Sequence, residues 1–138
     1  MATPPKTELK LFSSLRTDPA KTEEGMWFDN PESGDSLRMR PLMCPQQIKA
    51  YVEALDDYAR EHGEDARESK EAEAHAEAMS TALGQIVDWR LKDHPDMEYD
   101  PAVMASALAD PELEELRVWI RASTLNKNKF RPEVVAKK

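Results

Sequence analysis

The sequence predicts a mainly helical α+β fold, in which an N-terminal β-hairpin or small sheet packs on about four helices. Two short apolar runs near the N-terminus have the alternation of strands and flank a polar, turn-forming stretch. Beyond them, apolar residues recur at the helical spacing of three and four positions. The chain has 138 residues, of which 40% are apolar, so we expect a single domain with a modest core.

The predicted hairpin lies within residues 1–41. Its strands are residues 25–28 and 37–40, which a polar loop with Pro and Gly connects. Side chains alternate between the two faces of a strand, so each strand has one apolar face that can pack on helices. The residues on these faces are Met26, Phe28, Leu37 and Met39.

Residues 42–125 form the predicted helical region of the same domain. Pro41 and Pro45 end the hairpin region and open the first helix, because proline is tolerated at the first helical position. A second helix is predicted over residues 66–92, with a solvated first half and a core-packing second half. Two shorter helices follow Asp100 and Asp110, each an N-cap aspartate before a proline. The predicted core-facing residues are Ile48, Tyr51, Val52, Leu55, Tyr58 and Ala59 in the first helix, and Met79, Leu83, Ile86, Val87 and Arg90 share one side of the second.

Charge is distributed unevenly along the chain, which has 27 acidic and 19 basic side chains and a net charge of −8. Residues 56–77 contain nine acidic and three basic side chains, whereas residues 117–138 contain seven basic side chains and one acidic. The overall acidity argues against a nucleic-acid partner, because phosphate recognition needs clustered Lys and Arg. No apolar run approaches the roughly 20 residues of a membrane span. Residues 126–138 are predicted to be a basic, flexible tail.

The sequence has no pattern that is typical of a catalytic or metal site. Glu71 and His75 lie four residues apart on one helix face, but zinc requires three or four ligands, and a solvated pair is the favoured interpretation. The single cysteine, Cys44, cannot form an intrachain disulfide and has no flanking His or Lys, so we expect a buried apolar residue. We therefore expect no enzymatic activity, metal or cofactor.

Several short motifs follow one another between residues 18 and 133. They are Asp18-Pro19-Ala20, Glu24-Gly25-Met26-Trp27-Phe28, Leu37-Arg38-Met39-Arg40, Ile86-Val87-Asp88-Trp89, Tyr99-Asp100-Pro101, Leu108-Ala109-Asp110-Pro111-Glu112-Leu113 and Asn126-Lys127-Asn128-Lys129-Phe130. In this order and spacing, the chain resembles the tail assembly chaperones of long-tailed bacteriophages.

The resemblance implies a protein-binding role in the host cytoplasm. Such chaperones bind the long, helical and aggregation-prone tape measure protein before the tail tube polymerises, and they are absent from the finished virion. The tail tube protein is a further candidate partner, and homo-oligomerisation is left open. An acidic body with several methionines suits this role, because its charge favours solubility and Met side chains adapt to repetitive partners.

Candidate partner contacts come from the hairpin and from the C-terminal end. Trp is common in binding hot spots, although in a short chain it is first a core residue. The candidates are Trp27, Phe28 and Met39 in the hairpin and Arg117, Trp119, Arg121 and Phe130 in a second patch. Two other functions stay open: a small structural component of the tail or head–tail junction, and a small enzyme or regulator with a site that the sequence does not reveal.

Overall fold

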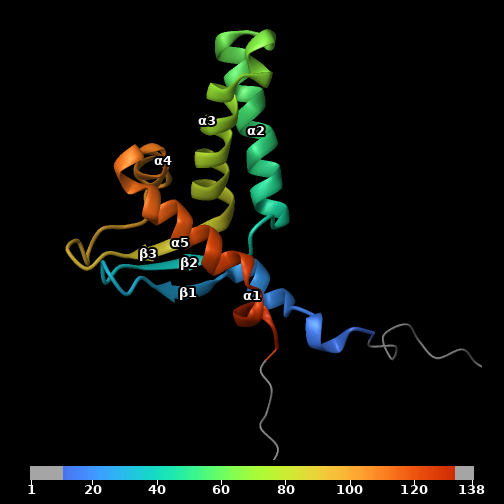
Figure 1. Ribbon diagram of the computed structural model, residues 1–138, viewed down its shortest axis with the longest axis vertical. Helices are drawn as coiled ribbons and strands as arrows, with labels where there is room; N and C mark the ends of the chain where they lie inside the picture. The colour runs from blue at the N-terminus through green and yellow to red at the C-terminus, as the bar shows by residue number, and fades with distance from the viewer. Residues whose placement is uncertain (1–10, 133–138) are drawn as a thin grey trace, which may run out of the picture.

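The computed structural model describes residues 11–132, which form a mainly helical α+β fold with one small sheet, as the sequence predicts (Figure 1). Its strands are β1 (Met26–Asp29), β2 (Ser36–Met39) and β3 (Ile86–Arg90). Its α-helices are α1 (Pro19–Glu24), α2 (Pro45–His62), α3 (Lys70–Ser80), α4 (Pro101–Ala109) and α5 (Glu114–Leu125). Short 3-10 turns are η2 (Ser13–Leu15), η3 (Glu64–Glu68), η5 (Pro111–Leu113) and η6 (Asn128–Phe130), and η4 (Thr81–Gln85) is π-helical.

The predicted N-terminal hairpin is confirmed. Strands β1 and β2 pair antiparallel, with Met26 opposite Met39 and Phe28 opposite Leu37. Phe28, Leu37 and Met39 are buried, and the half-buried Met26 packs against the same core. This apolar face holds the hairpin on the helices, because burying each large side chain contributes about 1.5–3 kcal/mol.

The second half of the helix predicted over residues 66–92 is wrong. Helix α3 ends at Ser80, and β3 follows the π-turn η4 and pairs antiparallel with the free edge of β2. A register shift opposite β2 makes Val87 an extra residue in β3, so Ile86 and Trp89 are both buried although they are three positions apart. The bulge therefore gives the buried residues of β3 a spacing that is also typical of a helix. The β-branched Ile86 and Val87 favour the strand.

The predicted helix starts are confirmed at three places. Helix α2 begins at Pro45. The side chain of Asp100 accepts a hydrogen bond from the Ala102 backbone N–H at 3.0 Å, and Asp110 accepts one from the Glu112 N–H at 2.9 Å. These caps satisfy backbone donors that lack a partner within the helix. The second cap opens the 3-10 turn η5, which leads into α5.

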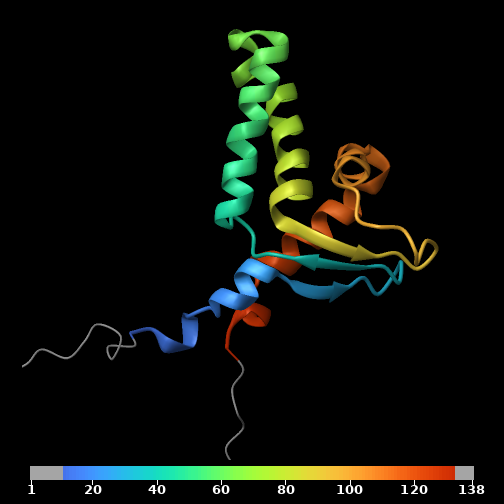
Figure 2. The same cartoon turned by 180° about the vertical axis from the view of Figure 1, so that it is seen from behind.

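The first part of the predicted flexible tail belongs to the core. Phe130 in η6 is fully buried, and its ring centroid lies 5.9 Å from that of Phe28. Its carbonyl accepts a hydrogen bond from the Asp18 N–H at 2.7 Å, so α1 and η6 lie side by side at the base of the molecule (Figure 2). Residues 133–138 of the predicted tail lie outside the described residues.

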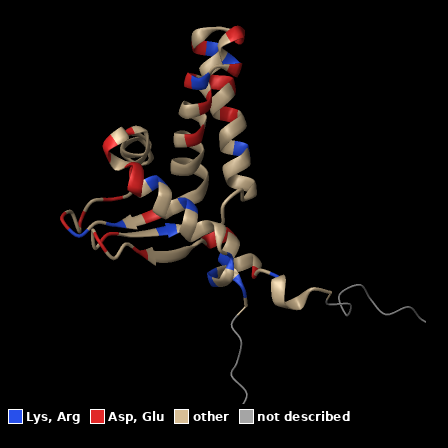
Figure 3. Cartoon of the chain, in the orientation of Figure 1, with Lys and Arg blue, Asp and Glu red and all other residues tan. Residues whose placement is uncertain are grey.

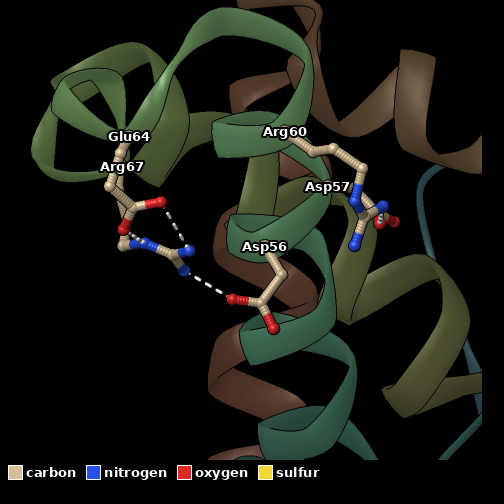
Figure 4. A network of polar contacts seen from close by, with 5 residues as sticks. All are labelled: Asp56, Asp57, Arg60, Glu64 and Arg67. Atoms are coloured by element: carbon tan, nitrogen blue, oxygen red, sulfur yellow. Dashed lines mark hydrogen bonds and ion pairs between the residues drawn. The ribbon is translucent and has the colours of Figure 1, made fainter.

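Helices α2 and α3 form an antiparallel hairpin that projects from the sheet (Figure 1). Ion pairs lie at the far end of this hairpin, among Asp56, Asp57, Arg60, Glu64 and Arg67 (Figure 4). The Arg67 guanidinium donates to Glu64 at 2.6 Å and also to Asp56. The first contact lowers the pKa of the Glu64 carboxyl. Exposed pairs of this kind contribute little stability, so they chiefly fix the turn geometry.

Candidate functional site

A groove of about 1070 Å³ lies where the α2–α3 hairpin meets α4 and α5. Most of the side chains that line it are apolar or small. They include Met43, Ile48, Val52, Ala78, Ala105 and Ile120. A groove of this composition offers an apolar surface to a ligand or to a segment of another protein.

The α2 wall of the groove exposes large apolar side chains. Ile48 and Val52 lie four residues apart, hence on one helix face, and they are 46% and 52% exposed. Met43, just before α2, is exposed beside them. Ala54 and Ala59 of the same helix are buried instead. The helical periodicity predicted Ile48 and Val52 on the core face, and this prediction is wrong because both line the groove.

Helices α3 and α4 line the groove partly with alanines. Helix α3 contributes Ala74 and Ala78, and α4 contributes Ala102, Ala105 and Ala109. Short side chains allow the axis of a packed helix to approach closely, since interaxial distances depend on the residues at the contact. The alanine-lined faces of α3 and α4 therefore allow a helix to pack closely in the groove.

A buried polar network holds the base of the groove in place. The Gln85 side-chain amide donates to Thr124 Oγ1 at 2.7 Å and to the Arg40 carbonyl at 3.3 Å. Gln47 donates to Gln85 Oε1 at 3.3 Å. The network connects α2, η4 and α5 with Arg40, which follows β2. The walls of the groove are therefore held in position before any partner binds.

Gly84 allows the start of α2 to lie directly against η4. A Cβ atom at this position would lie 2.5 Å from the Gln46 carbonyl oxygen and 2.5 Å from Gln47 Cα. No side chain larger than hydrogen fits at this distance, so glycine is required for the close approach. The buried Cys44 thiol also lies here, with Sγ 3.6 Å from the Gly84 carbonyl oxygen.

The charged residues that line the groove differ in sign between α3 and α5. In the cartoon of Figure 3, acidic residues colour much of α3, and basic residues occur along α5. Glu77 lies on α3, and together with Glu73 it raises the pKa of Tyr51, after the larger effect of that residue's burial. Arg117 and Arg121 lie on α5. The groove thus has an acidic side chain where α3 lines it and two basic side chains where α5 lines it; we call these its negative and positive margins.

The two arginines differ in how far they are engaged. Arg117 is half-buried and donates from Nη1 to the Leu108 carbonyl at 2.8 Å and to the Asp110 carbonyl at 2.9 Å, which caps the C-terminal end of α4. Arg121 is exposed and has no hydrogen bond or ion pair to another residue within 11–132. Arg121 is therefore available to an incoming group.

The structure disperses the residues that the sequence analysis proposed as partner contacts. Phe28, Met39 and Phe130 are buried in the core, so they are corrected from contact residues to core residues. Their apolar character made them candidates, but apolar character alone does not distinguish a core residue from an interface residue.

The remaining candidates lie at two places. The half-buried Trp27 ring stacks beneath the Arg90 guanidinium, whose carbon lies 3.9 Å from the ring centroid. The half-buried Trp119 packs against the core. Of the proposed contact residues, Arg117 and Arg121 line the groove. The apolar residues of the groove, such as Ile48 and Val52, belong to the helical periodicity of the sequence. That periodicity identifies them as apolar helix positions but does not show that they line a groove.

Within residues 11–132, no group of three or more His, Cys, Asp or Glu side chains is arranged to hold a metal ion. No helix in this part of the chain is both long enough and apolar enough to cross a membrane. The Glu71–His75 pair therefore has no third ligand among the described residues.

Comparisons with protein-family models, with curated proteins and with solved structures found no match. The function is therefore inferred from the groove and from the order of the sequence motifs.

Proposed function

We propose that this protein is a tail assembly chaperone of a long-tailed bacteriophage. It binds and solubilises the tape measure protein in the host cytoplasm, helps to recruit the tail tube protein, and leaves before the virion is complete. The motif order along the chain suggests this class of protein. The single structural observation that supports it is the apolar groove with the exposed Ile48 and Val52.

The groove suits a helical client on physical grounds. A client helix that lies in the groove buries its apolar stripe against Ile48 and Val52, which lie one turn apart on α2. Apolar burial stabilises the complex by about 25 cal/mol per Å² of area removed from water. The costs of association offset much of this gain, so the net affinity for a single helix is modest and allows release. The net charge of −8 keeps the complex soluble while the client is bound.

The proposal is tested by co-expression with the tape measure protein from the same genome. We expect the wild-type chain to make the tape measure protein soluble and to co-purify with it. Ile48→Asp should abolish this rescue, because it places a charge in the apolar wall.

Val103→Asp is the matched control. Val103 is 45% exposed, against 46% for Ile48, and both residues lie in the first turn of a helix that begins with proline. Aspartate is favourable in the first turn of a helix, so both variants should fold, which circular dichroism checks. Val103 is not among the groove residues, so its variant should rescue like the wild type.

Three results would contradict the proposal. The tape measure protein could remain insoluble with the wild-type chain, or the Ile48 and Val103 variants could behave alike. The third is detection of the chain in purified virions at the level of a tail protein, which would favour a structural component of the tail or head–tail junction.

A further inference from the structure

We infer that the groove selects an amphipathic helix whose apolar stripe is bordered by opposite charges, basic where it meets α3 and acidic where it meets α5. This inference rests on the proposed function, because it describes the client segment that the chaperone takes. It commits to the chemistry of the client and not to a second copy of this chain.

The negative margin of the groove comes from α3. Glu77 lines the groove, and Glu73 lies one turn before it on the same helix face; both are exposed. Neither carboxylate has a hydrogen bond or ion pair to a residue of the described chain. Both raise the pKa of Tyr51, which lines the groove, so their field reaches the surface on which a client would lie.

The positive margin comes from α5. Arg117 and Arg121 lie four residues apart, and both line the groove. Arg117 is held by the carbonyls at the end of α4, whereas Arg121 has no such contact within residues 11–132. Arg121 is thus the side chain that can pair with an acidic group of the client without losing an existing bond.

A groove with margins of opposite sign discriminates between helices that have the same apolar stripe. A helix with basic residues on both borders meets repulsion from Arg121, and one with acidic residues on both borders meets repulsion from Glu77. A helix with one border of each sign avoids both penalties when it is suitably oriented. The unlike margins therefore favour one orientation of the client as well as one class of client.

The test uses three designed peptides of about 18 residues, five helical turns, with an identical apolar stripe. One has a Lys border and a Glu border, one has Lys on both borders, and one has Glu on both. Binding to the full chain is measured by fluorescence anisotropy at low and high salt. We expect the mixed-charge peptide to bind most tightly at low salt, and the differences to shrink at high salt.

Two charge reversals assign the preference to the margins. Arg121→Glu should weaken the binding of the peptide with Glu on both borders and strengthen the binding of the peptide with Lys on both borders, by about two- to fivefold each. Glu77→Lys should do the reverse. Glu71→Lys and Lys127→Glu are the matched controls, because they make the same charge changes at exposed residues that do not line the groove. They should change the affinities for all three peptides little.

The inference is overturned if no peptide binds, if a single-charge peptide binds most tightly, or if the groove reversals and their controls have the same effects. Failure of the proposed function looks different. In that case the tape measure protein stays insoluble with the wild-type chain, whatever the peptides show. If the tape measure protein is solubilised and Ile48→Asp abolishes the effect, but the peptides are not discriminated by charge, the chaperone proposal stands and only the charge selectivity is wrong.

Discussion

Replacing Phe130 by alanine should remove a large part of the stability of the fold. The ring is 0% exposed and packs 5.9 Å from the Phe28 ring. A buried phenylalanine removes about 200 Å² from water, which at about 25 cal/mol per Å² is an upper figure of about 5 kcal/mol. Measured Phe→Ala losses in cores are about 3–5 kcal/mol. The free energy of unfolding of a typical domain is only about 5–15 kcal/mol, so this variant should be close to unfolding.

The assay is equilibrium unfolding in urea, followed by tryptophan fluorescence and circular dichroism. Phe130→Ala should lower the free energy of unfolding by about 3–5 kcal/mol with an unchanged dependence on urea concentration. Leu125→Ala is the control, because Leu125 is exposed at the end of α5 and its loss should cost under about 0.5 kcal/mol. A loss below about 1 kcal/mol for Phe130→Ala would refute the reasoning and restore a flexible segment from residue 126 onward.

Three further predictions follow from local contacts. Gly84→Ala should lower the melting temperature, with a loss of about 1–3 kcal/mol, because its Cβ would lie 2.5 Å from backbone atoms of α2; an unchanged melting temperature would contradict this close approach. Burial, and to a smaller extent Asp100, raises the pKa of Tyr99 above 10.0, so the folded state favours the neutral phenol. The contribution of Tyr99 to stability is therefore complete below pH 10 and is lost as the pH rises through the pKa of the folded state. Tyr99→Phe should flatten this alkaline loss in urea titrations and cost about 0.5–1.5 kcal/mol at neutral pH, since its hydroxyl donates to the Ala82 carbonyl; an unaltered pH profile would argue against it. The pKa of Glu64 is lowered by Arg67, so its small contribution is present above pH 4.5 and lost as the pH falls through the folded pKa, and Glu64→Gln should be slightly destabilising at pH 7 and neutral in acid when melting temperatures are compared.

Local signals in the sequence predicted the hairpin and the helix starts. The strands β1 and β2 alternate regularly around a turn-forming loop, and Asp100 and Asp110 cap their helices through their own side chains. These features depend on residues that are close in sequence, so a single chain displays them directly.

The errors concern contacts between residues that are distant in sequence. The bulge in β3 depends on its pairing with β2. It allows Ile86 and Trp89 both to be buried although they are three residues apart, a spacing that is typical of a helix. Phe130 stands alone among polar and basic residues, and its burial depends on the distant Phe28.

The groove is a similar case. Ile48 belongs to an apolar helix face in the sequence, but a periodic pattern does not state which element covers that face. Its exposure beside α4 and α5 is a property of the packed helices. The candidate groove was therefore visible only in the fold, whereas the proposed class of function came from the motif order.

Methyl NMR of the chain with labelled Ile, Leu and Val, recorded alone and in complex with the tape measure protein, locates the client surface directly. We expect the methyl signals of Ile48 and Val52 to shift or broaden on binding, because they form the exposed wall of the groove. Those of Val103 and Leu125, which are exposed but do not line the groove, should stay in place. Perturbation of Val103 or Leu125 with unchanged Ile48 and Val52 signals would contradict the proposal that the groove binds the tape measure protein.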